Sequence, residues 1–447
     1  MEIKLNRTKK DCFIFKAIKA NKDNRQFDVQ IIDTSINFVI NPTLFFDGRL
    51  FIRKLSSWLF KLKGKNFNFY LDSFLNLIPK SQITNMCFAI VCKINSLNLS
   101  DFCLKTKKEN DHFNIIVSKK YTQIFKLANE IGLATNYAQY AQVAPCNHMG
   151  IKKFITFVKQ KLNGVKKVKL SLLSQSELKK MQLLQAVNKG SDEQAQVLIL
   201  EYFNNSTSKK KVALVGKGIM MDTGGYSLKP SRAMKKMNED MTNAAAVFGT
   251  ILALAKNNAK VNVVGVIPLA KNFINDKAYK VGDIYTAYNG KTVEINDTDA
   301  EGRLILADAI SYTAKKISPT ILLSCATLTG LSALCFGEIL NPFWANNQKI
   351  AKQFYDACTI SGEYAIELPL LPQYLESVEK SSMVADYGNL NFGKTAGNAT
   401  AAAFLSKFNN KDNFIHLDNA GTNEFCGKSI NPFVLIFYNF VLNIFTN

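Results

Sequence analysis

The pattern of hydrophobic and polar positions changes along the chain, from short mixed segments to a longer regular alternation. Up to about residue 135, aromatic and β-branched runs alternate with helical patterns such as Tyr121 to Ile131. The runs are Phe27 to Ile32, Phe67 to Leu71 and Met86 to Val91. No cluster of candidate site residues falls here, so residues 1–135 are predicted to form a smaller, variable N-terminal α/β domain.

The segment 136–165 differs from both of its neighbours. Pro145 and Asn147 interrupt it, and a mixed helical pattern follows from Ile151 to Leu162. Because 447 residues exceed what one small core organises, we expect a connector at 136–165 and a second, larger domain at 166–447.

In residues 166–447, apolar strand-like runs alternate with helical patterns. The predicted strands are Val212 to Val215, Val261 to Ile267, Lys291 to Asn296, Thr320 to Leu328 and Phe414 to Leu417. The predicted helices are Thr242 to Ala255, Ala300 to Thr313 and Thr400 to Phe408. Strands that are apolar on both faces predict an α/β domain with a mixed, mostly parallel sheet flanked by helices. A site in such a fold lies at the carboxyl ends of the strands.

The apolar stretch Pro432 to Phe445 is short for a membrane span and is broken by Asn439 and Asn443, so it predicts a core or interface helix. The nine cysteines form no Cys-x-x-Cys pair, and the N-terminus lacks a signal-peptide pattern. These features predict a cytoplasmic protein with reduced thiols and no membrane association.

The net charge of +21 is concentrated in the first third of the chain. Residues 1–170 carry 29 Lys and Arg against 11 Asp and Glu, whereas residues 171–447 carry 27 against 24. A basic domain can bind nucleic acid, but lysines scattered in ones, twos and threes also arise from a lysine-rich composition. Both readings stay open at this point.

The run Asp297 to Leu304, DTDAEGRL, carries the strongest chemical signal. It sets Asp299, Glu301 and Arg303 at alternate positions after a β-like segment, and on an extended backbone these side chains would project the same way. Buried carboxylates need a partner, and a hard divalent cation is a natural one, with the arginine holding an anion beside it. The run predicts a metallohydrolase.

Two further motifs add candidate ligands. The segment Val215 to Lys229 places a glycine-flanked Lys217 at a strand end, followed by Asp222 and a Gly-Gly turn. A lysine in a tight apolar site can lose its proton and bind metal. In MNEDM, Asp240 precedes an alanine-rich helix and, taken alone, would be read as an N-cap.

Together, the motifs VGKGIMMDTGG, SLK, MNEDM, DTDAEGRL, ATLTG and HLDNAGT resemble the leucyl aminopeptidase (cytosol aminopeptidase) family over residues 165–447. The resemblance implies two divalent metal ions, Zn²⁺ or Mn²⁺. Asp222 and Glu301 would bridge the ions. Lys217 and Asp240 would complete one coordination shell, and Asp299 would complete the other.

The resemblance also implies the catalytic groups. Lys229 would stabilise the developing oxyanion. Arg303, with backbone amides of the turn formed by Ala300, Gly302 and Leu304, would hold a bicarbonate ion that acts as general base. Four residues would line a side-chain pocket that favours apolar N-terminal residues such as Leu or Met: Met237, Thr327, Gly330 and Ala420.

Three departures from the family pattern stand near this predicted site. Asp297 replaces a usual Asn, Thr242-Asn243 replaces a small, glycine-rich pair, and Asn423 occupies a position that is often apolar. The expected activity is metal-dependent release of the N-terminal residue from peptides, in a homohexamer. The alternatives are a DNA-binding or regulatory role of the basic N-terminal third, and a catalytically silent scaffold.

Overall fold

The computed structural model describes residues 13–19, 27–32, 35–40, 48–61, 67–95, 113–391 and 396–446. Contacts divide the chain into two units. The first comprises Met1–Asn98, Cys103–Leu133 and Thr359–Gly362, and the second comprises Leu99–Phe102, Ala134–Cys358 and Glu363–Asn447. The division falls within helix α4 (Thr122–Val143). The functional division into 1–135, 136–165 and 166–447 stays a prediction.

The first unit is a sheet with helices. Its described strands pair in the order β2-β3-β1-β4-β5, with β2 antiparallel to β3 and the other pairs parallel. The strands are β1 (Phe13–Lys19), β2 (Phe27–Ile32), β3 (Ser35–Ile40), β4 (Phe67–Tyr70) and β5 (Phe113–Ile116). The helices are α1 (Gly48–Lys61), α2 (Leu71–Leu75) and α3 (Ile83–Asn95).

One element of the first unit differs from the sequence pattern. The run Met86 to Val91 lies inside α3 instead of forming one of the strand-like segments, and every residue of the run is buried. A helix buried on all sides has no amphipathic period, so a short apolar run does not distinguish it from a strand.

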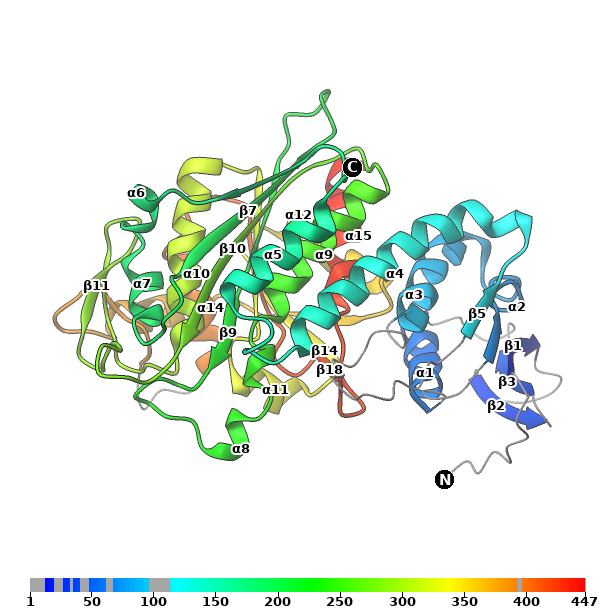
Figure 1. Cartoon of the computed structure of the whole chain (residues 1–447), viewed down its shortest axis with the longest axis horizontal. Helices are drawn as coiled ribbons and strands as arrows, with labels where there is room; N and C mark the ends of the chain where they lie inside the picture. The colour runs from blue at the N-terminus through cyan, green and yellow to red at the C-terminus, as the bar shows by residue number, and fades with distance from the viewer. Residues whose placement is uncertain are drawn as a thin grey trace. The chain divides into compact units, whose positions relative to one another are not determined.

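The second unit contains a large mixed sheet (Figure 1), which confirms the predicted fold class. Its strands pair in the order β15-β14-β17-β13-β8-β10-β7-β6, and β9 adds to the end of β10. The four strands from β17 to β10 are parallel to one another, whereas β7 and β14 run antiparallel to their inner neighbours. The strands are β6 (Val168–Leu172), β7 (Gln196–Phe203), β8 (Val212–Gly216), β9 (Gly218–Asp222), β10 (Asn262–Asn272), β13 (Ile321–Ala326), β14 (Leu340–Ala345), β15 (Tyr364–Glu367) and β17 (Phe414–Asp418).

Helices pack on both faces of this sheet (Figure 1). On one face α9 lies on β8 and β10, where Gly216 and Gly265 leave room for Val247. On the other, α10 packs on β8, β10 and β13 and contacts α7 and α14. The helices are α5 (Ile151–Leu162), α7 (Gln182–Asn188), α9 (Thr242–Lys256), α10 (Glu301–Tyr312), α11 (Gly330–Phe336), α12 (Gln348–Ile360), α13 (Pro372–Glu379), α14 (Gly397–Ser406) and α15 (Phe433–Thr446).

The apolar C-terminal stretch forms α15, which packs against α9 and is mostly buried within the chain. It is therefore a core helix, one of the two predicted alternatives. Among the residues that the structure describes, no helix is long and apolar enough to cross a membrane.

Asp308 ties α10 to its surroundings. Its buried carboxyl group accepts hydrogen bonds from the backbone amides of Leu184 in α7 (3.0 Å) and Tyr288 (2.7 Å). Asp308→Asn turns an amino group toward one of these amides, so we expect a loss of about 1–3 kcal/mol in the free energy of unfolding. Asp412→Asn at an exposed position is the control and should change little.

The ionisation of Asp308 predicts how the stability of the protein depends on pH. Burial raises the pKa of Asp308 to about 7, although its backbone hydrogen bonds oppose the shift. The folded state then holds the proton more tightly than the unfolded chain, so the wild type loses stability as pH rises from about 4 to about 7. The difference in unfolding midpoint between wild type and Asp308→Asn should narrow over that window. A difference that widens with pH would contradict this assignment.

Candidate metal centre and substrate pocket

The candidate site lies at the carboxyl ends of the parallel strands. Lys217 directly follows β8, and Asp222 ends β9 beside Asn272, the last residue of β10. Gly224 and Gly225 then turn the chain with φ angles of +84° and +62°, which side-chain-bearing residues rarely adopt. The turn leads to Lys229, whose ammonium group returns to Asp222.

The DTDAEGRL run is not extended, so the predicted reason for its convergence is wrong. Ala300 has φ −105° and ψ 40°, and α10 begins at Glu301. Asp299 therefore lies in the loop before the helix, whereas Glu301 and Arg303 lie in its first turn. Carboxylate oxygens of Asp222, Asp299 and Glu301 nevertheless lie within 4.8 Å of one another.

Two lysines lie among the carboxylates. The Nζ atom of Lys217 is 2.8 Å from both Asp240 Oδ1 and Glu301 Oε1. The Nζ atom of Lys229 is 2.8 Å from Asp222 Oδ2 and 2.5 Å from Asp299 Oδ1. Four carboxylates thus share two ammonium groups, and further positive charge would stabilise the cluster.

Burial and this excess of negative charge both shift the pKa values of the cluster. Burial, with repulsion from Asp222 and Glu301, raises the pKa of Asp299 to about 7. Burial also raises the pKa of Glu301 and of Asp240. Burial lowers the pKa of Lys217, but the surrounding carboxylates outweigh it and hold that pKa above its usual value. The carboxylates, not a neutral apolar pocket, dominate the surroundings of Lys217.

The donor set fits hard divalent cations. Asp222, Asp240 and Glu301 are each less than a tenth exposed, and within the described part of the chain the Oδ2 atom of Asp240 has no hydrogen-bond partner. Buried, converging carboxylate oxygens are ligands for such ions. A Cβ atom at Gly302 would lie 2.7 Å from the Nζ atom of Lys217, so a side chain there would displace this ammonium group.

Arg303 has donors to spare. Its Nη1 atom donates to the backbone oxygen of Asn389 at 2.9 Å, while its buried Nε atom lacks a hydrogen-bond partner among the described residues. Burial lowers the pKa of Arg303 to about 10, and the nearby acidic groups only partly oppose this. An anion beside the guanidinium would satisfy both its charge and its donors.

A cavity of about 640 Å³ opens onto the cluster. It is lined by eleven of the predicted or singled-out residues: Lys217, Asp222, Lys229, Met237, Asp240, Asp299, Glu301, Thr327, Gly330, Ala420 and Asn423. Arg303 and its neighbours Ala300, Gly302 and Leu304 do not line it.

The rim of this cavity is more polar than the sequence suggested. Lys236 and Glu424, both lining residues, form an ion pair at 3.1 Å. Lys235, Glu239 and Glu338 line the cavity as well. The apolar pocket residues are therefore surrounded by charged groups.

Asn389 holds the DTDAEGRL loop and was missed by sequence reasoning. Its buried amide accepts hydrogen bonds from the backbone of Asn296 (2.8 Å) and Asp297 (3.1 Å) and donates to the oxygen of Asp297 (2.6 Å). The backbone oxygen of Asn389 also accepts the hydrogen bond from the Nη1 atom of Arg303. A lone asparagine, far along the chain and outside every motif, carries no signal in the sequence.

Asp418 and Asn272 do not line the cavity, but they hold in place residues that do. Asp418, inside the HLDNAGT motif, accepts hydrogen bonds from Leu328 N (3.0 Å), Thr329 Oγ1 (2.6 Å) and Ser332 Oγ (2.8 Å). It therefore fixes the ATLTG loop against the loop after β17. Asn272 donates to Asp222 Oδ1 at 2.8 Å and so orients that carboxylate. Only the motif around Asp418 could have suggested either role.

The departures from the family pattern are accommodated. Asp297 Oδ1 accepts a hydrogen bond from the backbone amide of Asp299 at 2.8 Å, a contact that Asn would also make. Thr242 donates to the oxygen of Glu239 at 2.6 Å, and Asn243 exchanges two side-chain hydrogen bonds with Asn419. These contacts leave the predicted ligands gathered around the cavity.

Comparison with known proteins agrees with this arrangement. The catalytic domain of the cytosol aminopeptidase family matches residues 136–432. A probable cytosol aminopeptidase of Mycoplasma pneumoniae is 38% identical over 384 residues, which cover 84% of this chain and 85% of the relative. Its counterpart in Mycoplasma genitalium is 36% identical over 392 residues, 86% of each chain.

A solved structure shares the fold. The bottromycin maturation enzyme BotP superposes with a TM-score of 0.81 at 20% identity, covering 97% of this chain and 99% of that one. At this identity the likeness concerns the fold alone. The family match and the identity with these two relatives go further: the chain belongs to the cytosol aminopeptidase family, whose members are metal-dependent exopeptidases.

Proposed function

We propose that the protein is a two-metal aminopeptidase that releases the N-terminal residue, preferably an apolar one, from peptides during peptide turnover in the cytoplasm. The observation that carries this proposal is the convergence of the buried carboxylates of Asp222 and Glu301 with the half-buried carboxylate of Asp299. Two lysines and one open cavity accompany it.

Five residues would hold the ions. Asp222, Asp240, Asp299 and Glu301 would supply carboxylate oxygens, and Lys217 would supply its amine once a bound ion displaces the proton that the carboxylates favour there. When bound there, divalent ions would polarise a peptide carbonyl and lower the pKa of water, which would supply the nucleophile. Zn²⁺ and Mn²⁺ both suit the donors, and a structure of BotP in complex with Mn is consistent with the second choice.

Lys229 would stabilise negative charge on the oxygen of the reacting carbonyl. Its Nζ atom lies at the cavity, between Asp222 and Asp299, where water is partly excluded. The neighbouring carboxylates keep its pKa above the usual value although burial lowers it, so the group is cationic at neutral pH. A fixed ammonium group there acts most strongly on charge that develops during the reaction.

Arg303 and the backbone amides at the start of α10 would hold bicarbonate as the general base. The free Nε donor of Arg303 and the positive end of the helix dipole both favour an anion at this point. Supplying the base in this way would spare the chain a catalytic histidine.

The free α-amino group of a peptide would bind to one of the ions, as the resemblance to the family implies, and this would restrict cleavage to the N-terminal residue. Met237, Thr327, Gly330 and Ala420 would contact the first side chain, and the ion pair between Lys236 and Glu424 would border it. We expect Leu or Met to be accepted, with preferences of about 1–3 kcal/mol over smaller residues.

A homohexamer remains part of the proposal by resemblance to the family. The alternative role in DNA binding finds no support in the comparisons, which identify an aminopeptidase family. The alternative of a silent scaffold is disfavoured by the accommodation of Asp297 and Thr242.

A blocked substrate tests the proposal. With Mn²⁺ or Zn²⁺ present, the protein should release the chromophore from leucine p-nitroanilide and should leave its N-acetyl derivative intact, because acetylation removes the free amine that would bind to an ion. Comparable cleavage of both compounds would indicate an endopeptidase or amidase. Cleavage of neither, with either metal, would reject the proposal.

A further inference from the structure

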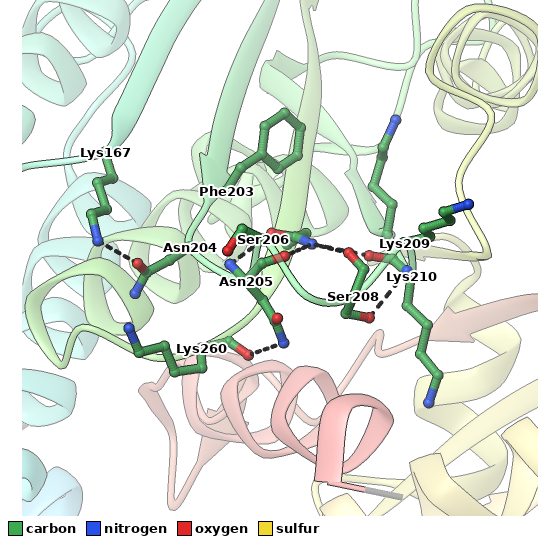
Figure 2. A pocket seen from close by; sticks show the side chains of 11 residues that line it. Lys167, Phe203, Asn204, Asn205, Ser206, Ser208, Lys209, Lys210 and Lys260 are labelled. Carbon is green, nitrogen blue, oxygen red and sulfur yellow. Dashed lines mark hydrogen bonds between the residues drawn. The ribbon is translucent and has the colours of Figure 1, made fainter.

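A second cavity, of about 550 Å³, lies at the opposite end of the large sheet from the carboxylates. It is lined mainly by the loop that leads from β7 to Val212, the first residue of β8. Lys217, in contrast, follows the last residue of β8. Figure 2 shows the side chains that line it. They are Lys167, Phe203, Asn204, Asn205, Ser206, Ser208, Lys209, Lys210, Lys211, Lys260 and Asn262.

Five of these lining residues are lysines and none is acidic. Four of the five lie within residues 171–447, where basic and acidic residues almost balance, so the cluster does not simply follow the composition of this region. Neighbouring ammonium groups repel one another and raise the local positive potential. The cavity therefore favours an anion.

The lysines are not neutralised by the protein. Lys210 and Lys211 donate to backbone oxygens, of Ile444 at 2.9 Å and Ile317 at 3.0 Å, which leaves their charge uncompensated. Over the described ranges of the chain, the ammonium groups of Lys209 and Lys260 have no hydrogen-bond or ion-pair partner. These two are available to a ligand.

The loop that carries the lysines is held firmly. Buried Asn262 donates to the backbone oxygens of Asn205 (2.8 Å) and Ser208 (3.0 Å) and accepts from the amide of Asn205 (3.0 Å). Lys167 adopts a left-handed φ of 65° and donates to Asn204 Oδ1 at 2.5 Å. A preformed frame lowers the entropy lost when a ligand binds.

We propose that this cavity binds an oligophosphate group. Figure 2 shows Lys167 and Lys260 on one side of the loop and Lys209 and Lys210 on the other, so several linked phosphates suit the cavity better than one. The hydroxyl groups of Ser206 and Ser208 add donors between the lysines, whereas the side-chain amides of Asn204 and Asn205 already donate to backbone oxygens of Ala259 and Lys260.

Two sources could present such a group, a free oligophosphate or a nucleoside polyphosphate. Phe203 can distinguish these two ligands, because its ring borders the cavity and the residue is 46% exposed. An exposed aromatic ring can stack on a nucleobase. Tripolyphosphate, ATP and adenosine therefore form the three arms of the test.

The test is calorimetric titration of the metal-loaded enzyme at low and at high salt. Tripolyphosphate should bind, more weakly at high salt, and adenosine alone should not bind. ATP binding more tightly than tripolyphosphate, with the difference lost in Phe203→Ala, identifies a nucleotide. Equal affinities identify a free oligophosphate. Absence of binding by both phosphate compounds overturns the proposal.

Charge reversal locates the binding. The double variant Lys209→Glu/Lys260→Glu should weaken tripolyphosphate binding at least about tenfold, equivalent to about 1.4 kcal/mol. Two reversals at exposed lysines of α5, Lys152→Glu/Lys159→Glu, change the net charge equally and should have little effect. Equal losses in both double variants would show a general charge effect and overturn the proposal.

Phosphates also bind metal ions, so one more variant is needed. Asp299→Ala, at the other end of the sheet, should bind tripolyphosphate as the wild type does. If it loses the binding, the phosphate interacts with the metal centre and the proposal is wrong. The pocket double variant should keep the wild-type rate on leucine p-nitroanilide, which verifies its fold independently.

Discussion

Lys229→Ala is expected to lower kcat for leucine p-nitroanilide by about 10²–10³, with a fall of similar size in kcat/KM. The Nζ atom of Lys229 lies at the cavity, within 2.8 Å of two carboxylates that are proposed to hold metal. A cation used mainly in the transition state changes kcat more than KM.

Metal content separates this role from a purely structural one. Removing Lys229 takes positive charge away from Asp222 and Asp299, so the carboxylates should bind divalent ions at least as well as before. Lys229→Arg should recover only part of the rate, because a guanidinium group places its donors differently. A variant with a normal kcat and a raised KM would contradict the assignment.

Asp299→Asn should abolish most of the activity, by a factor of at least about 10², because the amide offers one neutral oxygen in place of a charged carboxylate. Asp297→Asn is the matched control, two residues earlier in the same loop. Its Oδ1 contact to the amide of Asp299 survives the change, so its rate should stay within a few-fold of the wild type.

The comparison of these two variants is informative because both remove one negative charge from the same loop. Ion content measured beside the rate should fall in Asp299→Asn and stay normal in Asp297→Asn. If both variants lost the same activity, the loop charge as a whole, and not ligation by Asp299, would explain the loss.

The contiguous motifs are the part of the site that the sequence predicts well. Lys217 and Asp222 fall at strand ends, Asp240 precedes α9, and Lys229 lies in the loop after β9; the parallel sheet brings these segments together around one cavity. A parallel sheet with a site at its carboxyl edge follows from the apolar runs alone. This explains why residues from distant motifs could be grouped without a structure.

The predicted reason for the convergence of Asp299 and Glu301 was wrong, although their carboxylates do lie together. Alternate residues share a face only on an extended backbone, whereas here the chain turns into α10 between them. A side chain in the first turn of a helix lies beside the free backbone amide groups of the helix N-terminus, so Glu301 projects differently from a residue on an extended strand. The spacing of these residues in the sequence does not show where the chain turns into α10.

The residues that hold the loops of the two cavities in place could not be predicted from the sequence, for a different reason. Asn389 reaches the DTDAEGRL loop through tertiary contacts only, and its neighbours in the chain show no pattern. Asn262 holds the lysine-rich loop in the same way. Such roles depend on which buried backbone groups need partners, and this is known only once the fold is known.

The central claim is that two divalent ions per chain produce the activity. Its most direct test is to remove bound metal by dialysis against a chelator, add Mn²⁺ back in steps, and measure ions bound per chain together with the rate on leucine p-nitroanilide. The account predicts a rate that reaches its maximum when two ions are bound per chain. Full activity with no ion bound, or with only one, would contradict it.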